Sequence, residues 1–240
     1  MQRIVFLFLL ISQCAFGQFF VVKDKDGYVN IREKESVKSK ILGTLPNNKL
    51  LYIFHADEDI SKWHYINKGY IHNSRLKPTY TFLSIKKEKE SDNAITFSGM
   101  GIRVELTAQK YDKKKHTFTK ENKGDHYEYK IDGKPFEGTD GSEPETEYKS
   151  FVVSINGKQV NIPKSAYRDM YVPAFSETSV YYDKEDDIIY IEAQNGTGAG
   201  GYDVCWQIVK GIYKTREVGY FNYKEDKPQL LERIGKFVRS

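Results

Sequence analysis

The sequence predicts an all-β protein with two parts, a small N-terminal barrel and a larger antiparallel domain. Tyr and Phe occur 18 and 14 times in 240 residues, and both residue types favour strands. Short apolar or alternating runs recur between turn signals, which is typical of barrels and sandwiches. A charged stretch over residues 85–93 separates the parts and has the pattern of an exposed linker or of the edge of a long hairpin. We expect a barrel over 18–78, a linker over 79–93, and an antiparallel domain over 94–240.

Residues 1–17 have the pattern of an export signal. Arg3 precedes an unbroken apolar run over residues 4–11, and Ala15-Phe16-Gly17 places small residues at the −3 and −1 positions of a cleavage site. We therefore expect a mature chain that begins at Gln18 and a periplasmic or secreted protein. The apolar run is far shorter than the ~20 residues that cross a bilayer, so we expect no membrane span.

The chain has two cysteines, Cys14 and Cys205. Cys14 offers lipid attachment as an alternative to simple cleavage, but the preceding Gln13 disfavours it. Cleavage leaves Cys205 alone, so no intramolecular disulfide can form. Cys205 lies between Val204 and Trp206 in a predicted strand. We expect a buried structural thiol, because a nucleophilic thiolate is favoured at a helix N-terminus.

The net charge is +4, and lysines alternate with acidic residues throughout. This pattern indicates a solvated surface rather than a basic patch. We therefore expect no nucleic-acid partner.

The N-terminal part shows several short strand patterns. Residues 19–22 are apolar, residues 27–31 alternate, and further runs cover 50–54 and 63–66. Turn residues separate these runs, and Pro78 ends the last one. Several short strands in so few residues predict a small barrel.

Four segments of this part carry a resemblance to a known family. They are Gly27-Tyr28-Val29-Asn30-Ile31-Arg32, Leu42-Gly43-Thr44-Leu45, Trp63-His64-Tyr65, and Gly69-Tyr70-Ile71-His72 with the following Asn73-Ser74-Arg75-Leu76-Lys77-Pro78. Together they resemble the bacterial SH3 (SH3b) domain, a binding module of exported proteins.

The resemblance implies an SH3-like barrel that binds cell-wall peptide or an extracytoplasmic protein. In the family, loop aromatics line the groove, and the candidates here are Tyr28, Tyr52, Tyr65 and Tyr70. We expect Trp63 to lie in the core rather than in the groove. The resemblance also implies that Asn30 and Arg32 order the following loop. That loop reads Glu33-Lys34-Glu35-Ser36, without the family's Gly-Pro.

The C-terminal part predicts an antiparallel sandwich or barrel. Asn156-Gly157 between two alternating runs favours a type I′ hairpin, and Asp132-Gly133 follows the run 127–131. We expect two short helices, over 164–171 after Pro163 and over 228–238. Segments such as Gly138-Thr139-Asp140-Gly141 also resemble secreted Bacteroidetes proteins that have no assigned activity.

Two loops of this part are candidate sites. The Gly-rich loop 195–201 lacks the Lys-Ser/Thr pair of a phosphate loop, so we expect no nucleotide cofactor. Tyr202 and Asp203 at its end are candidate ligand contacts. The acidic loop contains Asp140, Glu143, Glu145 and Glu147. These carboxylates could serve acid–base chemistry or bind a cation, but a solvated loop is the preferred interpretation.

Asp24-Lys25-Asp26-Gly27 resembles part of a calcium loop. In that alignment Val22 stands at the first ligand position, which requires an oxygen ligand. Ordinary turn chemistry explains the segment better. We expect no metal site.

These observations predict an exported, non-catalytic binding protein. The first alternative is an exported immunity or inhibitor protein that neutralises a toxin or hydrolase. The third hypothesis is a peptidoglycan hydrolase of unfamiliar fold.

Overall fold

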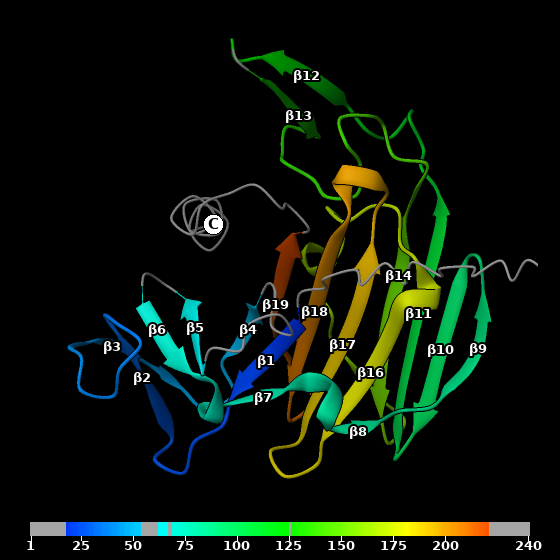
Figure 1. The fold of residues 1–240 in the computed structure, drawn as a ribbon. Helices are drawn as coiled ribbons and strands as arrows, with labels where there is room; N and C mark the ends of the chain where they lie inside the picture. The colour runs from blue at the N-terminus through cyan, green and yellow to red at the C-terminus, as the bar shows by residue number, and fades with distance from the viewer. Residues whose placement is uncertain (1–17, 54–61, 67–68, 125, 221–240) are drawn as a thin grey trace, which may run out of the picture.

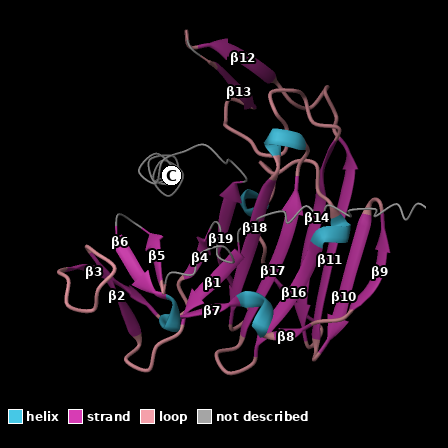
Figure 2. Ribbon diagram, in the orientation of Figure 1, coloured by secondary structure: helices cyan, strands magenta, loops and turns pink. Residues whose placement is uncertain are grey.

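The computed structural model describes residues 18–53, 62–66, 69–124 and 126–220. The predicted export signal, Cys14 and the predicted helix over 228–238 lie outside these residues. The described chain is all-β, as predicted, and its short helical segments are 3₁₀ turns of three residues each (Figure 2).

Two antiparallel five-stranded sheets form a sandwich in the C-terminal part (Figure 1). The outer sheet has the order β15-β14-β11-β10-β9, with bounds β9 (Lys87–Ser91), β10 (Ala94–Gly99), β11 (Ile102–Lys110), β14 (Thr146–Ile155) and β15 (Lys158–Val160). The central sheet has the order β19-β18-β17-β16-β8, with bounds β8 (Leu83–Ser84), β16 (Thr178–Asp183), β17 (Ile188–Asn195), β18 (Tyr202–Val209) and β19 (Ile212–Tyr220). A separate hairpin, β12 (Phe118–Asn122) and β13 (Tyr127–Ile131), projects from one end.

Two smaller antiparallel sheets form the N-terminal part. The β1 sheet has the order β4-β1-β7 and the β2 sheet has the order β3-β2-β6-β5. Their bounds are β1 (Gln18–Val22), β2 (Tyr28–Arg32), β3 (Ile41–Pro46), β4 (Leu50–Ile53), β5 (Trp63–Ile66), β6 (Gly69–His72) and β7 (Leu76–Pro78). Inward residues of both sheets share a small core that includes Val22, Ile31, Leu51 and Ile71. The predicted small barrel is not confirmed: in the described residues the two sheets are separate ladders and form no closed barrel.

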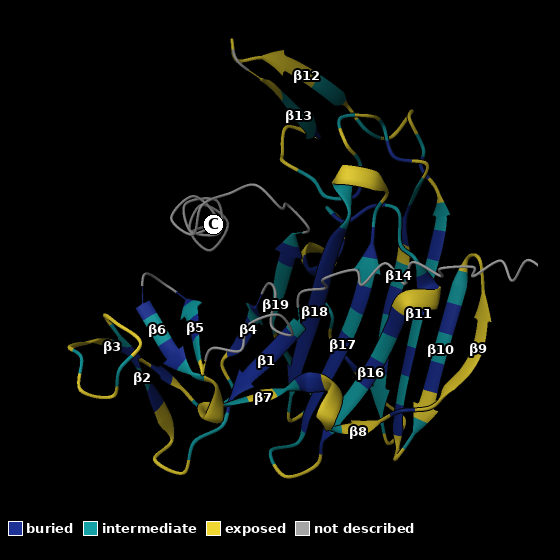
Figure 3. Cartoon of the chain, in the orientation of Figure 1, coloured by how far each residue is buried: buried dark blue, intermediate teal, exposed yellow. Residues whose placement is uncertain are grey.

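The central sheet is covered on both faces. Along β18, Tyr202, Val204, Trp206 and Ile208 point into the sandwich core, because alternate residues share a face. The opposite face meets the β1 sheet in a second apolar cluster, which consists of Phe19, Val21 and Leu50 from the N-terminal part and Ile188, Tyr190 and Cys205 from the central sheet. Seven of the eight residues of β18 are therefore buried, which Figure 3 shows as a dark strand in the middle of the molecule.

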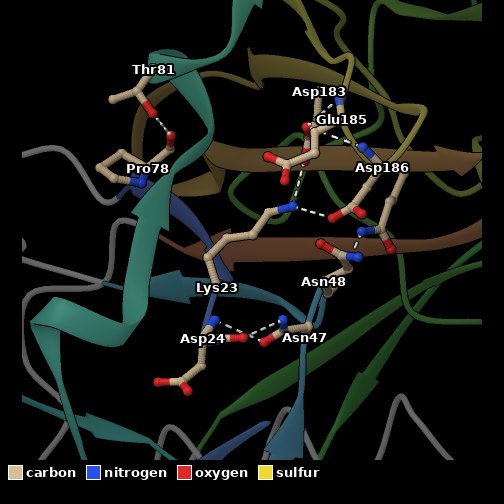
Figure 4. A network of polar contacts seen from close by, with 10 residues as sticks. Lys23, Asp24, Asn47, Asn48, Pro78, Thr81, Asp183, Glu185 and Asp186 are labelled. Atoms are coloured by element: carbon tan, nitrogen blue, oxygen red, sulfur yellow. Dashed lines mark hydrogen bonds and ion pairs between the residues drawn. The ribbon is translucent and has the colours of Figure 1, made fainter. Parts of the chain in front are cut away.

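Polar contacts fasten the two parts beside this cluster (Figure 4). Lys23, just after β1, donates to Asp183 Oδ2 at 2.6 Å and also pairs with Asp186. Gln207 Nε2 donates to the Asn48 carbonyl at 2.9 Å. Burial alone would lower the pKa of Lys23, but its bonds to the two aspartates outweigh burial and raise it. The ammonium therefore stays charged at this junction.

The segment 79–93 is part of both C-terminal sheets instead of a free linker. Leu83 and Ser84 pair with β16, and β9 pairs with β10 in a hairpin, the alternative that the sequence left open. Ile85 is 2% exposed and packs in the sandwich core, which anchors the segment. The exposed Lys and Glu side chains of β9 lie on a sheet edge, where charge discourages pairing with another chain.

The predicted helix over 164–171 is also wrong. Only Lys164–Ala166 forms a 3₁₀ turn, and the residues after it pair with other segments: Met170 bridges to Glu137 and Tyr171 bridges to Glu147. These tertiary backbone pairs override the local helix signal. The predicted Asn156-Gly157 hairpin is confirmed, with φ of 50° and 78° at the two turn residues.

We expect Lys23→Ala to lower the free energy of unfolding by about 1–3 kcal/mol, because Asp183 would stay buried without its partner. Lys25→Ala, at an exposed neighbouring lysine, should change it by no more than about 0.5 kcal/mol. Urea unfolding measures both variants. Equal stability of the two variants would show that this ion pair does not fasten the junction.

Candidate functional site

The outward face of the β2 sheet gathers aromatic and polar side chains. In β2, Val29 and Ile31 are buried, so Tyr28, Asn30 and Arg32 point outward. Tyr28 is 48% exposed. The alternation in the sequence therefore sets the composition of this surface.

The hairpin of β5 and β6 adds four rings to the same face. Trp63 lies opposite His72, and Tyr65 lies opposite Tyr70. The Trp63 and His72 rings make an edge-to-face contact with centroids 5.0 Å apart, and the two tyrosine rings do the same at 5.2 Å. Such pairs fix ring orientation, which lowers the entropy that a ligand contact would cost.

A shallow hollow of about 230 Å³ lies beside these rings. We call it the β2 groove. Its aromatic and apolar wall consists of Tyr28, Val37, Trp63 and His72. Its polar wall consists of charged side chains with neighbouring amides and hydroxyls, among them Asp24, Asp26, Arg32 and Arg75.

Hydrogen bonds hold the polar wall in place. Asp24 Oδ1 accepts from the Asp26 amide at 2.8 Å, and its other oxygen pairs with Arg75. The Asp26 amide, followed by Arg75, lowers the pKa of Asp24. Arg32 Nη1 donates to the Ser39 carbonyl at 2.9 Å and so braces the loop between β2 and β3.

The structure brings three of the four predicted tyrosines to one face. Tyr28 lines the β2 groove, and Tyr65 and Tyr70 lie on the same side of the sheet. Trp63 was expected in the core but lines the groove, because His64 and Ile66 are the inward residues of β5. The alternation of residues along β5 could have placed Trp63 on the outward face, because His64 and Ile66 occupy the inward face.

Tyr52 lies elsewhere, at the junction of the two parts. Its ring packs 5.2 Å from Phe19 and against Gly219, where an added Cβ would come within 2.2 Å of the ring. Its hydroxyl donates to Asp203 Oδ2 at 2.8 Å. Two predicted ligand contacts from different parts of the chain therefore bind each other.

Tyr202 cannot contact a ligand at the surface. It is fully buried, and its hydroxyl donates to the Tyr171 carbonyl at 3.1 Å. The β18 period places it in the sandwich core, so the predicted contact role is wrong. Asp203, the next residue, is 2% exposed but faces the junction.

The Gly-rich loop and the acidic loop meet at one end of the sandwich. The Thr197 amide donates to the Gly138 carbonyl at 3.1 Å, and Gly200 lies so close to the Thr139 backbone that an added Cβ would be 2.2 Å away. Glycine at 200 is thus required by backbone approach.

Glu147 of the acidic loop is buried rather than solvated. His116 lies between Glu147 Oε2 at 3.0 Å and Asp132 Oδ2 at 2.8 Å. Burial would lower the pKa of His116, but the two carboxylates raise it. Because each ring nitrogen has a carboxylate partner, the imidazole serves as a brace at the base of the projecting hairpin.

Cys205 is fully buried, as its alternation with neighbouring residues predicted. Burial raises the pKa of its thiol, which disfavours the thiolate. Its side chain belongs to the apolar cluster at the junction.

Comparison with protein-family models, curated proteins and solved structures found no match for this chain. Among the described residues, no helix has the length and apolar character needed to cross a bilayer.

The junction face of the central sheet holds acidic groups that resist ionisation. Burial raises the pKa of Glu192 to about 7 and that of Asp203 to about 6. Between the normal and raised values, the folded protein binds more protons than the unfolded chain, so its stability falls as pH rises.

We expect Glu192→Gln to match the wild type in stability at pH 4.5 and to exceed it by about 1–3 kcal/mol at pH 8, because the amide never carries the buried charge. Urea unfolding across this pH range measures the difference. Glu185→Gln, at an exposed acid, is the matched control. A stability difference between Glu192→Gln and wild type that does not change with pH would contradict the assignment.

Proposed function

We propose that this chain is an exported, non-catalytic binding protein whose β2 groove binds a peptide segment of the cell wall or of an extracytoplasmic protein. The observation that carries the proposal is the convergence of Tyr28, Trp63 and His72 around one hollow. Aromatic anchors of this kind supply most of the binding energy in many interfaces.

The electrostatics of the groove support a peptide ligand. Acidic and basic side chains stand along one wall and already pair with each other, as Asp24 does with Arg75. A wall of mixed charge offers hydrogen bonds to amide groups without requiring a strongly charged partner. The resemblance to the SH3b family supports the same ligand class.

The buried thiol and the His116 imidazole described above both have structural roles, which supports binding rather than catalysis. Cys205 is buried at the junction, and His116 is engaged at both ring nitrogens. Neither lines the β2 groove.

We expect the double variant Tyr28→Ala, Trp63→Ala to weaken binding to purified sacculi, or to soluble cell-wall peptides, by about 2 kcal/mol or more, which is roughly 30-fold. Tyr127→Ala is the control, because Tyr127 is 50% exposed on the projecting hairpin away from the groove. Co-sedimentation and calorimetric titration measure the affinities.

Circular dichroism should show the same fold for both variants, since Tyr28 and Trp63 belong to none of the buried clusters. Undiminished binding by the double variant would reject the groove as the binding site. Binding by neither wild type nor variants would reject cell-wall peptide as the ligand.

A further inference from the structure

A cavity of about 410 Å³ lies at the junction of the two parts, apart from the β2 groove. Its walls come from β1 and the 3₁₀ turn Thr79–Thr81 on one side and from β16, β17 and β18 on the other. Ligand sites often form where two parts of a chain meet in this way.

The cavity wall is acidic. Glu177, Glu192 and Asp203 line it, and no Lys, Arg or His is found among its described lining residues. This contrasts with the β2 groove, where acids and arginines pair. Carboxylates grouped without a cation repel each other and raise the cost of ionising any one of them.

Two carboxylate oxygens in this cavity lack hydrogen-bond partners. Asp203 is 2% exposed; its Oδ2 accepts from Tyr52, while its Oδ1 has no partner among the described residues. Glu192 Oε1 is also a buried oxygen atom without a hydrogen-bond partner among the described residues. A buried acceptor without a donor costs free energy, and such groups are rare in native proteins. The missing partner must bring hydrogen-bond donors.

The side chains around the two carboxylates favour an ammonium group over a metal ion as the ligand. In the described part of the chain, no group of three or more His, Cys, Asp or Glu side chains could hold a metal ion. An ammonium group, in contrast, brings three donors and one positive charge, which suits two carboxylates. Tyr181 and the half-exposed Tyr80 also line the cavity, and aromatic rings are favourable neighbours for a cation and for the carbon stem that carries it.

We propose that this junction cavity binds a primary ammonium group carried on a short aliphatic stem, with Glu192 and Asp203 as its anchors. The site is separate from the β2 groove and uses different residues, so either site can fail without the other.

Calorimetric titration of the full chain with pentylammonium at pH 7.5 tests the proposal. We expect a Kd of about 1 mM or tighter, which is within reach of a ligand of this size. Pentanol, which has the same stem without the charge, should bind at least ~10-fold more weakly, because it loses the charge-assisted hydrogen bonds.

Glu192→Gln and Asp203→Asn should each weaken pentylammonium binding ~10-fold or more. Glu185→Gln, at an exposed acid outside the cavity, should bind like wild type. Glu192→Gln removes a buried charge at this pH, so we expect it to be at least as stable as wild type. Urea unfolding of each variant separates a loss of binding from a loss of stability.

A second readout is proton release. The titratable groups that face the cavity are Glu177, Glu192, Asp203, Tyr80 and Tyr181. An ammonium that pairs with ionised Glu192 and Asp203 should release protons at pH 6, detected as binding heats that depend on the buffer's ionisation enthalpy. Equal binding of pentanol, or unchanged affinity in both Glu192→Gln and Asp203→Asn, would overturn the proposal.

Discussion

The burial of the central sheet on both faces is the constraint on which the rest of this structure depends. Its sandwich face packs on the outer sheet, and its other face packs on the β1 sheet around Phe19, Leu50 and Tyr190. An antiparallel sheet commonly leaves one face in water. Here the N-terminal part covers the second face, so the two parts share a buried apolar cluster.

The second face is also where polar groups are buried. Some of these groups have hydrogen-bond partners across the junction: Lys23 donates to Asp183, and Tyr52 donates to Asp203. Glu192 Oε1 and Asp203 Oδ1 have no hydrogen-bond donor among the described residues. An apolar face would have been simpler for stability alone, which is why we assign a ligand to these carboxylates. The β2 sheet, in contrast, has its small core on one side only and is free to present aromatic rings outward.

The features that the sequence predicts correctly depend on local patterns, such as the alternation of residues along a strand or a two-residue turn. The alternation of β2 placed Tyr28, Asn30 and Arg32 on one face, and Asn156-Gly157 defined a hairpin. Cys205 was predicted to be buried for the same reason. Each of these features depends on neighbours within a few residues, so one sequence is sufficient to predict them.

The features that were missed depend on distant contacts. Tyr52 meets Asp203 across 151 positions of the chain, and no local pattern encodes that pairing. The helix predicted over 164–171 does not form, because Met170 and Tyr171 make backbone bridges to distant residues instead. The charged residues 87–91 had the composition of a linker, because an exposed edge strand and a linker both face water. Only the buried Ile85 distinguishes them, and its burial comes from the fold.

Scanning calorimetry of the chain most directly tests the claim that one doubly covered sheet joins the two parts. The account predicts a single transition whose calorimetric and van't Hoff enthalpies agree, because unfolding the β1 sheet would uncover the central sheet. It also predicts that residues 18–78 alone melt at a much lower temperature than the same residues within the chain. Two separate transitions, with the isolated N-terminal part melting as it does in the whole protein, would contradict the account.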